Sequence, residues 1–219
     1  MMDTFIERLI ERHATGLPGR PFQMKKAVFA RRQLFDAPLT ARQSAVLILL
    51  FPKAGDWHVV LTERVGSAND PHSHQISFPG GSLDVSDVSL EACALRETYE
   101  EVGINPQTVN IIGKMTDLYI PVSNFHVHPF LGWTNTPPQY IRQTMEVKDI
   151  IEAPLSILTN PDNQKSIDMT IRGMHLPDVP YFDVNGRVVW GATAMMLSEF
   201  LELVHSFLNT DGTDLSDLH

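Results

Sequence analysis

The sequence predicts an α/β fold with a mixed β-sheet, and three features lead to this prediction. The run Ser44–Phe51, SAVLILLF, is continuously apolar and has the length of a strand buried on both faces. A helix rich in carboxylates is expected between Ser89 and Gly103, with strand-like segments before and after it. A last helix over Gly191–Leu208 closes the chain. Strands around a central helix, followed by a closing helix, fit an α/β sandwich.

Length and composition fit one domain. The chain has 219 residues and is 43% hydrophobic, which is enough to bury a full core. Three parts are expected: a basic N-terminal arm at residues 1–42, the main domain at 43–208 and an acidic, flexible tail at 209–219.

The charge is negative and unevenly distributed. A formal net charge of −9 argues against nucleic-acid binding, which depends on Lys and Arg that neutralise phosphates. Residues 1–42 hold eight of the 17 Lys and Arg and four acids, so they carry +4 and the remainder carries −13. The arm either helps to hold an anionic substrate or is a solvated segment without a role.

The cysteine content and the apolar runs suggest a location. The single cysteine, Cys93, excludes an intrachain disulfide and is expected to pack among apolar residues of the central helix. No apolar run reaches the length of a membrane span, and the N-terminus does not resemble a signal sequence. A cytoplasmic protein with no membrane partner is therefore expected.

The N-terminal residues Asp3–His13 predict an amphipathic helix. Its apolar face is formed by Phe5, Ile6, Leu9 and Ile10. The polar face is mixed in sign rather than basic, so the helix is expected to dock onto the protein body or onto a second subunit, as in a homodimer. A loop should follow over residues 15–42, with a short helix around Lys25–Leu34.

Four strands are expected around the central helix. After Ser44–Phe51 comes a turn at Lys53–Asp56, and Trp57–Thr62 returns as the hairpin partner. Val109–Leu118 and Phe125–Trp133 are expected as further strands beyond the helix.

The C-terminal part predicts a short helix and further strands. The helix should begin at Pro154 and run to Leu158, with proline in its first turn. Lys165–Arg172 is expected as a strand. Met174–Phe182 should be an edge strand or a loop, because Pro177 and Pro180 interrupt it. Arg187–Trp190 then leads into the terminal helix.

The central helix has a defined start and end. Either Ser89 or Asp87 can cap its first turn, because a short side-chain oxygen there accepts a hydrogen bond from an unpaired backbone N–H. Gly103 suits the position after the last turn, where the chain takes a left-handed conformation.

Three glutamates of this helix point to metal chemistry. Glu97, Glu100 and Glu101 have i, i+3, i+4 spacing, so they project from one side and repel one another. A bound Mg²⁺ would offset that repulsion, since it takes carboxylate oxygens and bridges to substrate phosphates. Arg96 can hold Glu100 by a charge-assisted hydrogen bond. A solvated acidic face is the alternative for the glutamates alone.

The stretch from Phe78 to Ile104 resembles the signature box of the Nudix hydrolases. The second half of the box matches in register at Arg96, Glu97, Glu100, Glu101, Gly103 and Ile104. Two positions depart from it: Thr98 replaces an aliphatic residue, and the gap from Gly81 to Arg96 is one residue longer. The longer gap, with Asp84, Asp87 and Ser89, is similar to the coenzyme A diphosphatase subgroup.

The resemblance to that subgroup extends before the box. By this resemblance, the implied substrate-binding residues are Arg64, His72, Gln75, Phe78, Pro79 and Gly80. The subgroup's arginine before the histidine is replaced by Asn69 or Asp70, and its glycine before the glutamine is His74. These departures affect the expectation that coenzyme A is the substrate, and they leave the hydrolytic residues intact.

Two further groups of residues carry open alternatives. The pairs His72 and His74, and His126 and His128, share a strand face, but hydrogen-bonded or phosphate-facing histidines are favoured over a zinc site. Glu146 stands where Nudix enzymes place an additional acid near the metals, and a solvated turn glutamate is the alternative.

The resemblance implies a fold, a reaction and a set of roles. The fold is a Nudix α/β/α sandwich with a mixed sheet and a catalytic loop-helix-loop. The reaction is Mg²⁺- or Mn²⁺-dependent cleavage of the diphosphate of coenzyme A or an acyl derivative. The implied catalytic residues are Glu97, Glu100, Arg96 and Glu146. The implied metal ligands are Glu97, Glu100, Glu101 and the Gly81 carbonyl. Hydrolysis of ADP-ribose or another nucleoside diphosphate derivative, and a non-catalytic ligand sensor, are the alternatives.

Overall fold

The structure, a computed structural model, describes residues 4–28, 36–66, 75–171 and 173–208. The chain forms two compact units. One comprises residues 34–53 and 57–153 and contains the central helix. The other comprises residues 1–33, 54–56 and 154–219. The boundaries predicted at residues 42 and 208 stay predictions.

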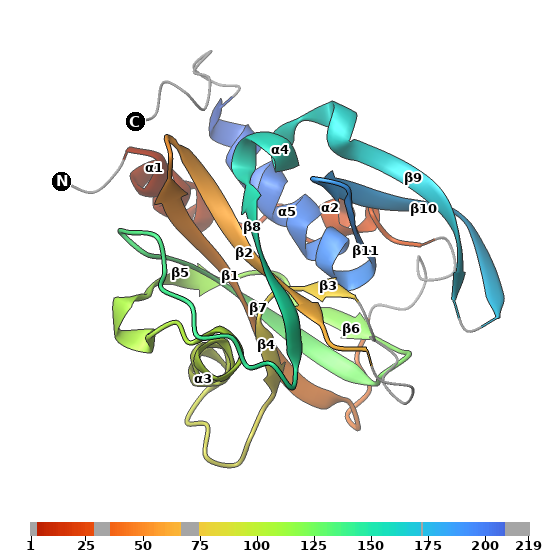
Figure 1. Cartoon of the computed structure of the whole chain (residues 1–219), viewed down its shortest axis with the longest axis horizontal. Coiled ribbons are helices and arrows are strands. Elements are labelled where there is room, and N and C mark those ends of the chain that lie inside the picture. Colours follow the sequence, from red (N-terminus) through yellow and green to blue (C-terminus); the bar gives the residue numbers. More distant parts are fainter. Residues whose placement is uncertain (1–3, 29–35, 67–74, 172, 209–219) are drawn as a thin grey trace. The chain divides into compact units, whose positions relative to one another are not determined.

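The unit with the central helix is built on a mixed sheet. Its main path has the order β3-β2-β1-β7-β5, with β4 paired to β1, β6 to β7 and β8 to β2 (Figure 1). The strands are β1 (Arg42–Lys53), β2 (Asp56–Arg64), β3 (Ile76–Ser77), β4 (Gly80–Ser82), β5 (Asn110–Lys114), β6 (Leu118–Ile120), β7 (Phe125–Trp133) and β8 (Val147–Pro154). β1 and β7 are parallel and β4 is antiparallel to β1, which confirms the mixed sheet.

The apolar run of β1 is buried as its sequence predicts. Its residues from Leu47 to Phe51 are all 0% exposed. Residues at alternate positions, including Leu47, Leu49 and Phe51, pack in a core cluster with Cys93 and Ala94 of α3 (Leu90–Val102). This packing fixes α3 against β1, the strand with which β4 pairs.

One expected strand is divided in two. The segment predicted as a continuous strand over Val109–Leu118 forms β5 and β6, which pair with opposite ends of β7. Between β5 and β6, residues 115–117 lie opposite only two residues of β7, one of which is Pro129. Proline has no N–H for the ladder, and the Pro129 carbonyl accepts a bond from the Met115 N–H at 2.8 Å instead.

The second unit consists of helices and a three-stranded sheet. Its helices are α1 (Thr4–Ala14), α2 (Arg20–Met24), α4 (Leu155–Thr159) and α5 (Gly191–Leu208), and its strands β9 (Gln164–Ile171), β10 (Met174–Val184) and β11 (Arg187–Trp190) are ordered β11-β10-β9. Both α1 and α2 pack against α5. Phe5, Ile6 and Leu9 are fully buried, so the apolar face of α1 docks within its own chain.

A short helix lies at Arg20–Met24, before the expected range. Of the helix expected around Lys25–Leu34, residues 25–28 form turns and coil instead, and the rest lies outside the described residues. The helix Arg20–Met24 starts earlier than expected because Gly19 precedes it and a proline lies in its first turn.

The segment Met174–Phe182 is a strand and not a loop. Its first part, Met174–Pro180, pairs with β9 alone and is an edge, as one of the two predicted alternatives has it, whereas Tyr181 and Phe182 lie between β11 and β9. A register shift between Leu176 and Val179 takes up Pro177 as a bulge. β11 pairs only with Tyr181–Val184, so Pro180 has a neighbour on one side alone. Both prolines thus avoid a ladder position that needs their missing N–H.

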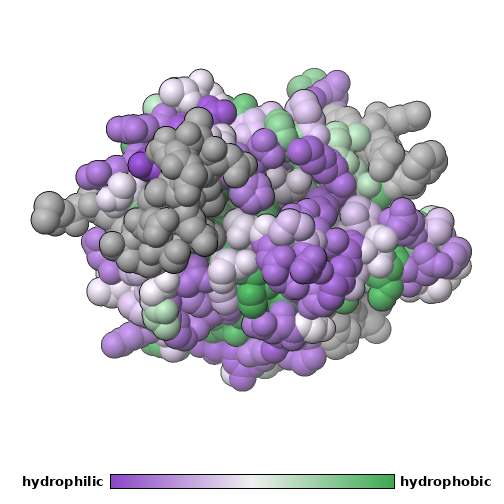
Figure 2. Space-filling model, turned by 90° about the horizontal axis from the view of Figure 1, so that it is seen from above, coloured by the Kyte–Doolittle hydropathy of each residue, from purple (hydrophilic) through white to green (hydrophobic). Residues whose placement is uncertain are grey.

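The surface in Figure 2 is mostly hydrophilic, and hydrophobic residues form only small separate areas on that face. No helix within the described ranges is both long enough and apolar enough to span a membrane.

Candidate active site

The helix α3 is held at both ends by the residues that its sequence provides. The Ser89 hydroxyl accepts a hydrogen bond from the Ala92 N–H at 3.0 Å, so Ser89 and not Asp87 is the cap. At the other end Gly103 has φ 77°, and its N–H donates to the Tyr99 carbonyl at 2.8 Å. These two ends fix which residues α3 presents next to β4.

Arg96 lies at the centre of the carboxylates. Its Nη1 is 2.8 Å from a Glu100 oxygen and 2.9 Å from a Glu97 oxygen. Its Nη2 donates to the Ser82 carbonyl at 3.2 Å and to Asp87 at 2.8 Å. The guanidinium thereby joins two glutamates of α3 to the segment that precedes the helix.

Asp87 is the strongest partner of Arg96. Its carboxylate receives two hydrogen bonds, from Nε at 2.9 Å and from Nη2 at 2.8 Å, and only 3% of its side chain is exposed. The hydrogen bonds from Arg96 lower the pKa of Asp87 to about 2. The sequence placed Asp87 near the box and as an alternative cap. The only sequence signal for the ion pair itself is that an acid and a base occur in the same motif.

Glu97 depends on the glycine opposite it. A Cβ atom on Gly81 would lie 2.4 Å from a Glu97 carboxylate oxygen, so only glycine allows the carboxylate to approach β4. Burial raises the pKa of Glu97, while Arg96 opposes that shift. The Gly81 carbonyl, expected as a further metal ligand, lies 3.7 Å from the Cys93 sulfur.

Glu101 is the most buried of the three glutamates, at 4% exposed. It accepts a hydrogen bond from the Gly80 N–H at 3.3 Å, and Nη1 of Arg64 is 3.7 Å from its other oxygen. Burial raises the pKa of Glu101 to about 7. Arg64 and Gly80 were expected to bind substrate, and the structure brings both to this carboxylate.

Glu146 lies near the same carboxylates, although it comes from the segment before β8. Its charge raises the pKa of Glu97 and of Glu101. Its carbonyl accepts a bond from the Val65 N–H at 2.8 Å, which places it beside the end of β2. The structure therefore brings Glu146 within electrostatic reach of Glu97 and Glu101.

The remaining residues expected to bind substrate are placed differently. Gln75 immediately precedes β3, and its carbonyl accepts from the Arg64 N–H at 3.1 Å. Phe78 is 1% exposed and packs in the interior, and Pro79 is also buried. His72, together with the departures Asn69, Asp70 and His74, lies outside the described residues.

The later histidine pair is hydrogen-bonded, as favoured by the sequence. His126 Nε2 pairs with Asp117, and His128 Nε2 lies 2.7 Å from the Gln43 side-chain oxygen. The two rings are 4.3 Å apart. Both histidines thus have partners of their own within the protein.

The donor chemistry of the site fits a hard divalent cation. Glu97, Glu100 and Glu101 supply carboxylate oxygens, and burial raises the pKa of Glu97 and Glu101, which a nearby cation would reverse. Among the described residues no three Asp, Glu, His or Cys side chains are already arranged as a metal site. Arg96 contacts one oxygen of Glu97 and one of Glu100, so the other oxygen of each carboxylate lies outside these contacts.

The fold and the site define an α/β protein in which one helix gathers carboxylates around an arginine, beside Gly80 and Gly81 of β4. Residues 41–161 match the family model described as the NUDIX domain. Because this match covers more than half of the chain, the chain belongs to the Nudix family, and it is a Nudix hydrolase.

The relatives agree with this assignment. "Uncharacterized Nudix hydrolase NudL" of Citrobacter koseri is 35% identical over 170 residues, which cover 77% of this chain and 86% of that protein. The protein of the same name from an Enterobacter species is 36% identical over 161 residues, covering 74% and 82%. Among solved structures, the Nudix hydrolase RenU of M. Smegmatis has a TM-score of 0.51 at 12% identity and covers 76% of this chain and 88% of its own, a likeness of fold.

Proposed function

We propose that this Nudix hydrolase cleaves the diphosphate bond of a nucleoside diphosphate derivative, with coenzyme A or an acyl-coenzyme A as the leading substrate. The products would be an adenosine 3′,5′-bisphosphate and a phosphopantetheine. The observation that carries the proposal is the arrangement of three glutamates of α3: Glu97 and Glu101 approach Gly81 and Gly80 of β4, and Glu100 is held by Arg96.

Each residue of the site has a role in this proposal. Glu97, Glu100 and Glu101 would hold one or more Mg²⁺ or Mn²⁺ ions. A divalent ion bound there offsets charge on the diphosphate and lowers the pKa of an attacking water. Arg96 positions Glu97 and Glu100, and Asp87 in turn fixes Arg96.

Proton acceptance falls to Glu146 or to one glutamate of α3. Glu146 is exposed and close enough for its charge to act on Glu97 and Glu101. Arg64 has a favourable position for the substrate, because its guanidinium already lies beside Glu101 and is one-third exposed. A cation there can pair with a phosphate.

The choice of coenzyme A rests on the sequence resemblance before and within the box. The relatives are named as hydrolases without a substrate, so ADP-ribose and other nucleoside diphosphate derivatives remain the alternatives, followed by a non-catalytic sensor. A cytoplasmic location belongs to the same proposal and agrees with the free, buried Cys93.

A substrate panel tests the proposal. The wild type and Glu100→Gln are incubated with Mg²⁺ or Mn²⁺ and coenzyme A, acetyl-coenzyme A, ADP-ribose, NADH or diadenosine polyphosphates, and products are identified by mass. Glu91→Gln is the matched control, since Glu91 is an exposed glutamate in the first turn of the same helix.

We expect the wild type and Glu91→Gln to cleave coenzyme A to the two named products, and Glu100→Gln to lose at least about 100-fold in turnover. Preference for ADP-ribose would keep the chemistry and replace the substrate. Tight metal binding without turnover of any compound would contradict hydrolysis and favour the sensor.

A further inference from the structure

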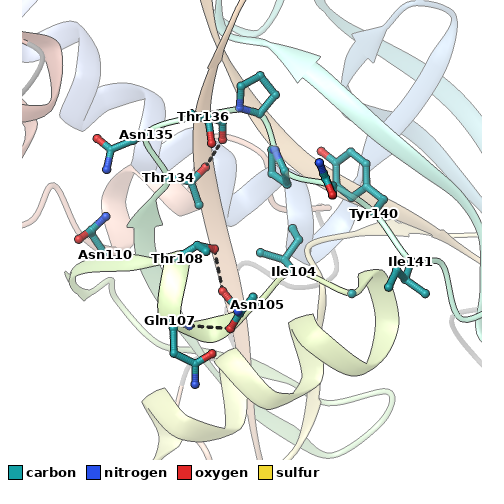
Figure 3. A pocket seen from close by; sticks show the side chains of 14 residues that line it. Ile104, Asn105, Gln107, Thr108, Asn110, Thr134, Asn135, Thr136, Tyr140 and Ile141 are labelled. Atoms are coloured by element: carbon teal, nitrogen blue, oxygen red, sulfur yellow. Dashed lines mark hydrogen bonds between the residues drawn. The ribbon is translucent and has the colours of Figure 1, made fainter.

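A pocket of about 720 Å³ lies at the C-terminal end of α3 (Figure 3). One wall is formed by Gly103, Ile104 and the 3₁₀ turn η2 (Pro106–Thr108). The opposite wall is formed by residues 134–141, which follow β7. Its size is in the range that accommodates a small organic ligand or part of one.

The lining of this pocket is polar but carries no charged side chain. Amides and hydroxyls dominate it, with two prolines, a tyrosine and two isoleucines as the apolar part. Figure 3 shows Asn110 and Asn135 on facing sides of the pocket. The nearest basic residue along the chain, Arg142, instead donates to the carbonyls of Val147 and Lys148.

Some lining groups serve the fold, and others are available to a ligand. Asn105 accepts from the Gln107 N–H at 3.0 Å, and Thr134 donates to the Thr136 carbonyl at 2.9 Å. Within the described ranges no hydrogen bond engages the side-chain amides of Asn135 or Gln139. Such groups suit a ligand that both donates and accepts hydrogen bonds.

The pocket is rigidly joined to the catalytic helix. The Ile141 N–H donates to the Val102 carbonyl, and the Gln143 N–H to the Glu101 carbonyl, each at 2.9 Å. None of the glutamates lines the pocket, so a substrate that occupies both places must extend from the pocket to the carboxylates.

The pocket offers no group that would pair with a phosphate. No basic side chain lines it. The Glu101 and Val102 carbonyls at this end of α3 already accept hydrogen bonds from the Gln143 and Ile141 N–H groups. The arginines of the site, Arg64 and Arg96, lie instead beside the glutamates.

We propose that this pocket binds the uncharged, hydrogen-bonding arm of the diphosphate substrate, while the diphosphate lies at the glutamates. This inference rests on the proposed function and adds the specificity pocket to it. An amide-linked arm such as pantetheine and an uncharged nucleoside or sugar share the required chemistry.

The first test measures binding without turnover. Isotope-labelled protein is titrated with pantetheine, adenosine, ribose or adenosine 3′,5′-bisphosphate, and the side-chain amide NMR signals of Asn110 and Asn135 are followed. We expect at least one uncharged compound to shift these signals and the bisphosphate to leave them unchanged. The compound that binds identifies the arm. No shift with any uncharged compound, or a shift with the bisphosphate alone, would overturn the proposal.

The second test uses variants that alter the pocket only. Asn135→Trp should fill it and Asn135→Ala should remove one amide. Gln164→Trp, at an exposed position of β9 outside the pocket, is the control. We expect Asn135→Trp to raise KM at least about tenfold with kcat changed less than about twofold, Asn135→Ala to raise KM less, and Gln164→Trp to match the wild type.

The two proposals fail in different ways. If the wild type hydrolyses none of the diphosphate compounds, the proposed function fails whatever the pocket binds. If the wild type is active and both Asn135 variants keep the wild-type KM, the pocket assignment alone is wrong. The Asn135→Ala variant keeps this outcome readable if Asn135→Trp does not fold.

Discussion

The Asp87 carboxylate and the Arg96 guanidinium form a two-point contact across nine residues, with hydrogen bonds of 2.9 and 2.8 Å. This contact ties the segment before α3 to the side of the helix that carries the glutamates. Arg96 then has its Nη1 free to approach Glu97 and Glu100. The positions of Glu97 and Glu100 therefore depend on Asp87, which need not touch the substrate.

Replacement of Asp87 by Asn tests this dependence. The variant removes the ionic partner that accepts two hydrogen bonds from the guanidinium, so we expect a loss of about 2 kcal/mol in the free energy of unfolding. Turnover should fall as well, because Arg96 no longer positions the glutamates. Urea unfolding and steady-state kinetics measure the two effects. Asp84→Asn, an exposed carboxylate in the same turn, should change stability by less than about 0.5 kcal/mol. Equal losses in both variants would argue against the role of the Asp87–Arg96 pair.

Replacement of Gly81 by Ala should separate activity from stability. The new Cβ would lie 2.4 Å from a Glu97 oxygen, so the Glu97 side chain must move. The end of a flexible side chain gives way at little cost, and we expect unfolding to change by less than about 1 kcal/mol. Turnover should fall at least about tenfold, since a small misplacement of a catalytic group is costly. Full activity in this variant would show that Glu97 does not act from its position against Gly81.

Addition of Mg²⁺ or Mn²⁺ should stabilise the folded protein. A ligand that binds only the native state raises stability by about 2.7 kcal/mol when present at 100 times its dissociation constant. Thermal unfolding with and without the ion measures the gain. Glu101→Gln should lose most of it, whereas Glu91→Gln should retain it. An ion effect of the same size in both variants would place the metal elsewhere.

His128 should make stability depend on pH. Burial, followed by the charges of Lys114 and His126, lowers its pKa to about 4, and Asp117 opposes the shift. The unfolded chain, with a histidine pKa near 6.5, binds the proton more strongly. The stability that neutral His128 contributes is thus complete above about pH 6.5 and is lost as the pH falls through about 4.

Urea unfolding of the wild type and His128→Gln at several pH values measures this contribution. The difference in stability between them should shrink on acidification between pH 6.5 and 4. Titration of the imidazole signals by NMR checks the assignment. A His128 pKa near 6.5 in the folded protein would contradict the burial argument.

Much of the fold follows from local features of the sequence. The run of apolar residues in β1 predicts a doubly buried strand, and β1 is 0% exposed from Leu47 to Phe51. Ser89 and Gly103 mark the ends of α3 because capping depends on residues next to the helix. The i, i+3, i+4 spacing of the glutamates places them on one side of the helix, because the helical period is also a local property of the chain.

The features that the sequence did not predict depend on distant partners. The break between β5 and β6 arises from Pro129 on β7, which cannot be known before the pairing is. Which part of β10 lies inside its sheet depends on where β11 ends. In the site, the pairing of Arg64 with Glu101 joins residues 37 positions apart, and only the folded chain brings them together.

Turnover of four glutamine variants tests the central claim most directly. Glu91, Glu97, Glu100 and Glu101 all lie on α3, and each is replaced singly by Gln. Hydrolysis of coenzyme A is then measured with Mg²⁺ in proteins whose unfolding transitions show that they are folded. We predict that Glu91→Gln keeps the wild-type rate and that the other three each lose at least about 100-fold. Folded Glu97→Gln, Glu100→Gln and Glu101→Gln proteins with wild-type rates would contradict the assignment of the active site to this helix.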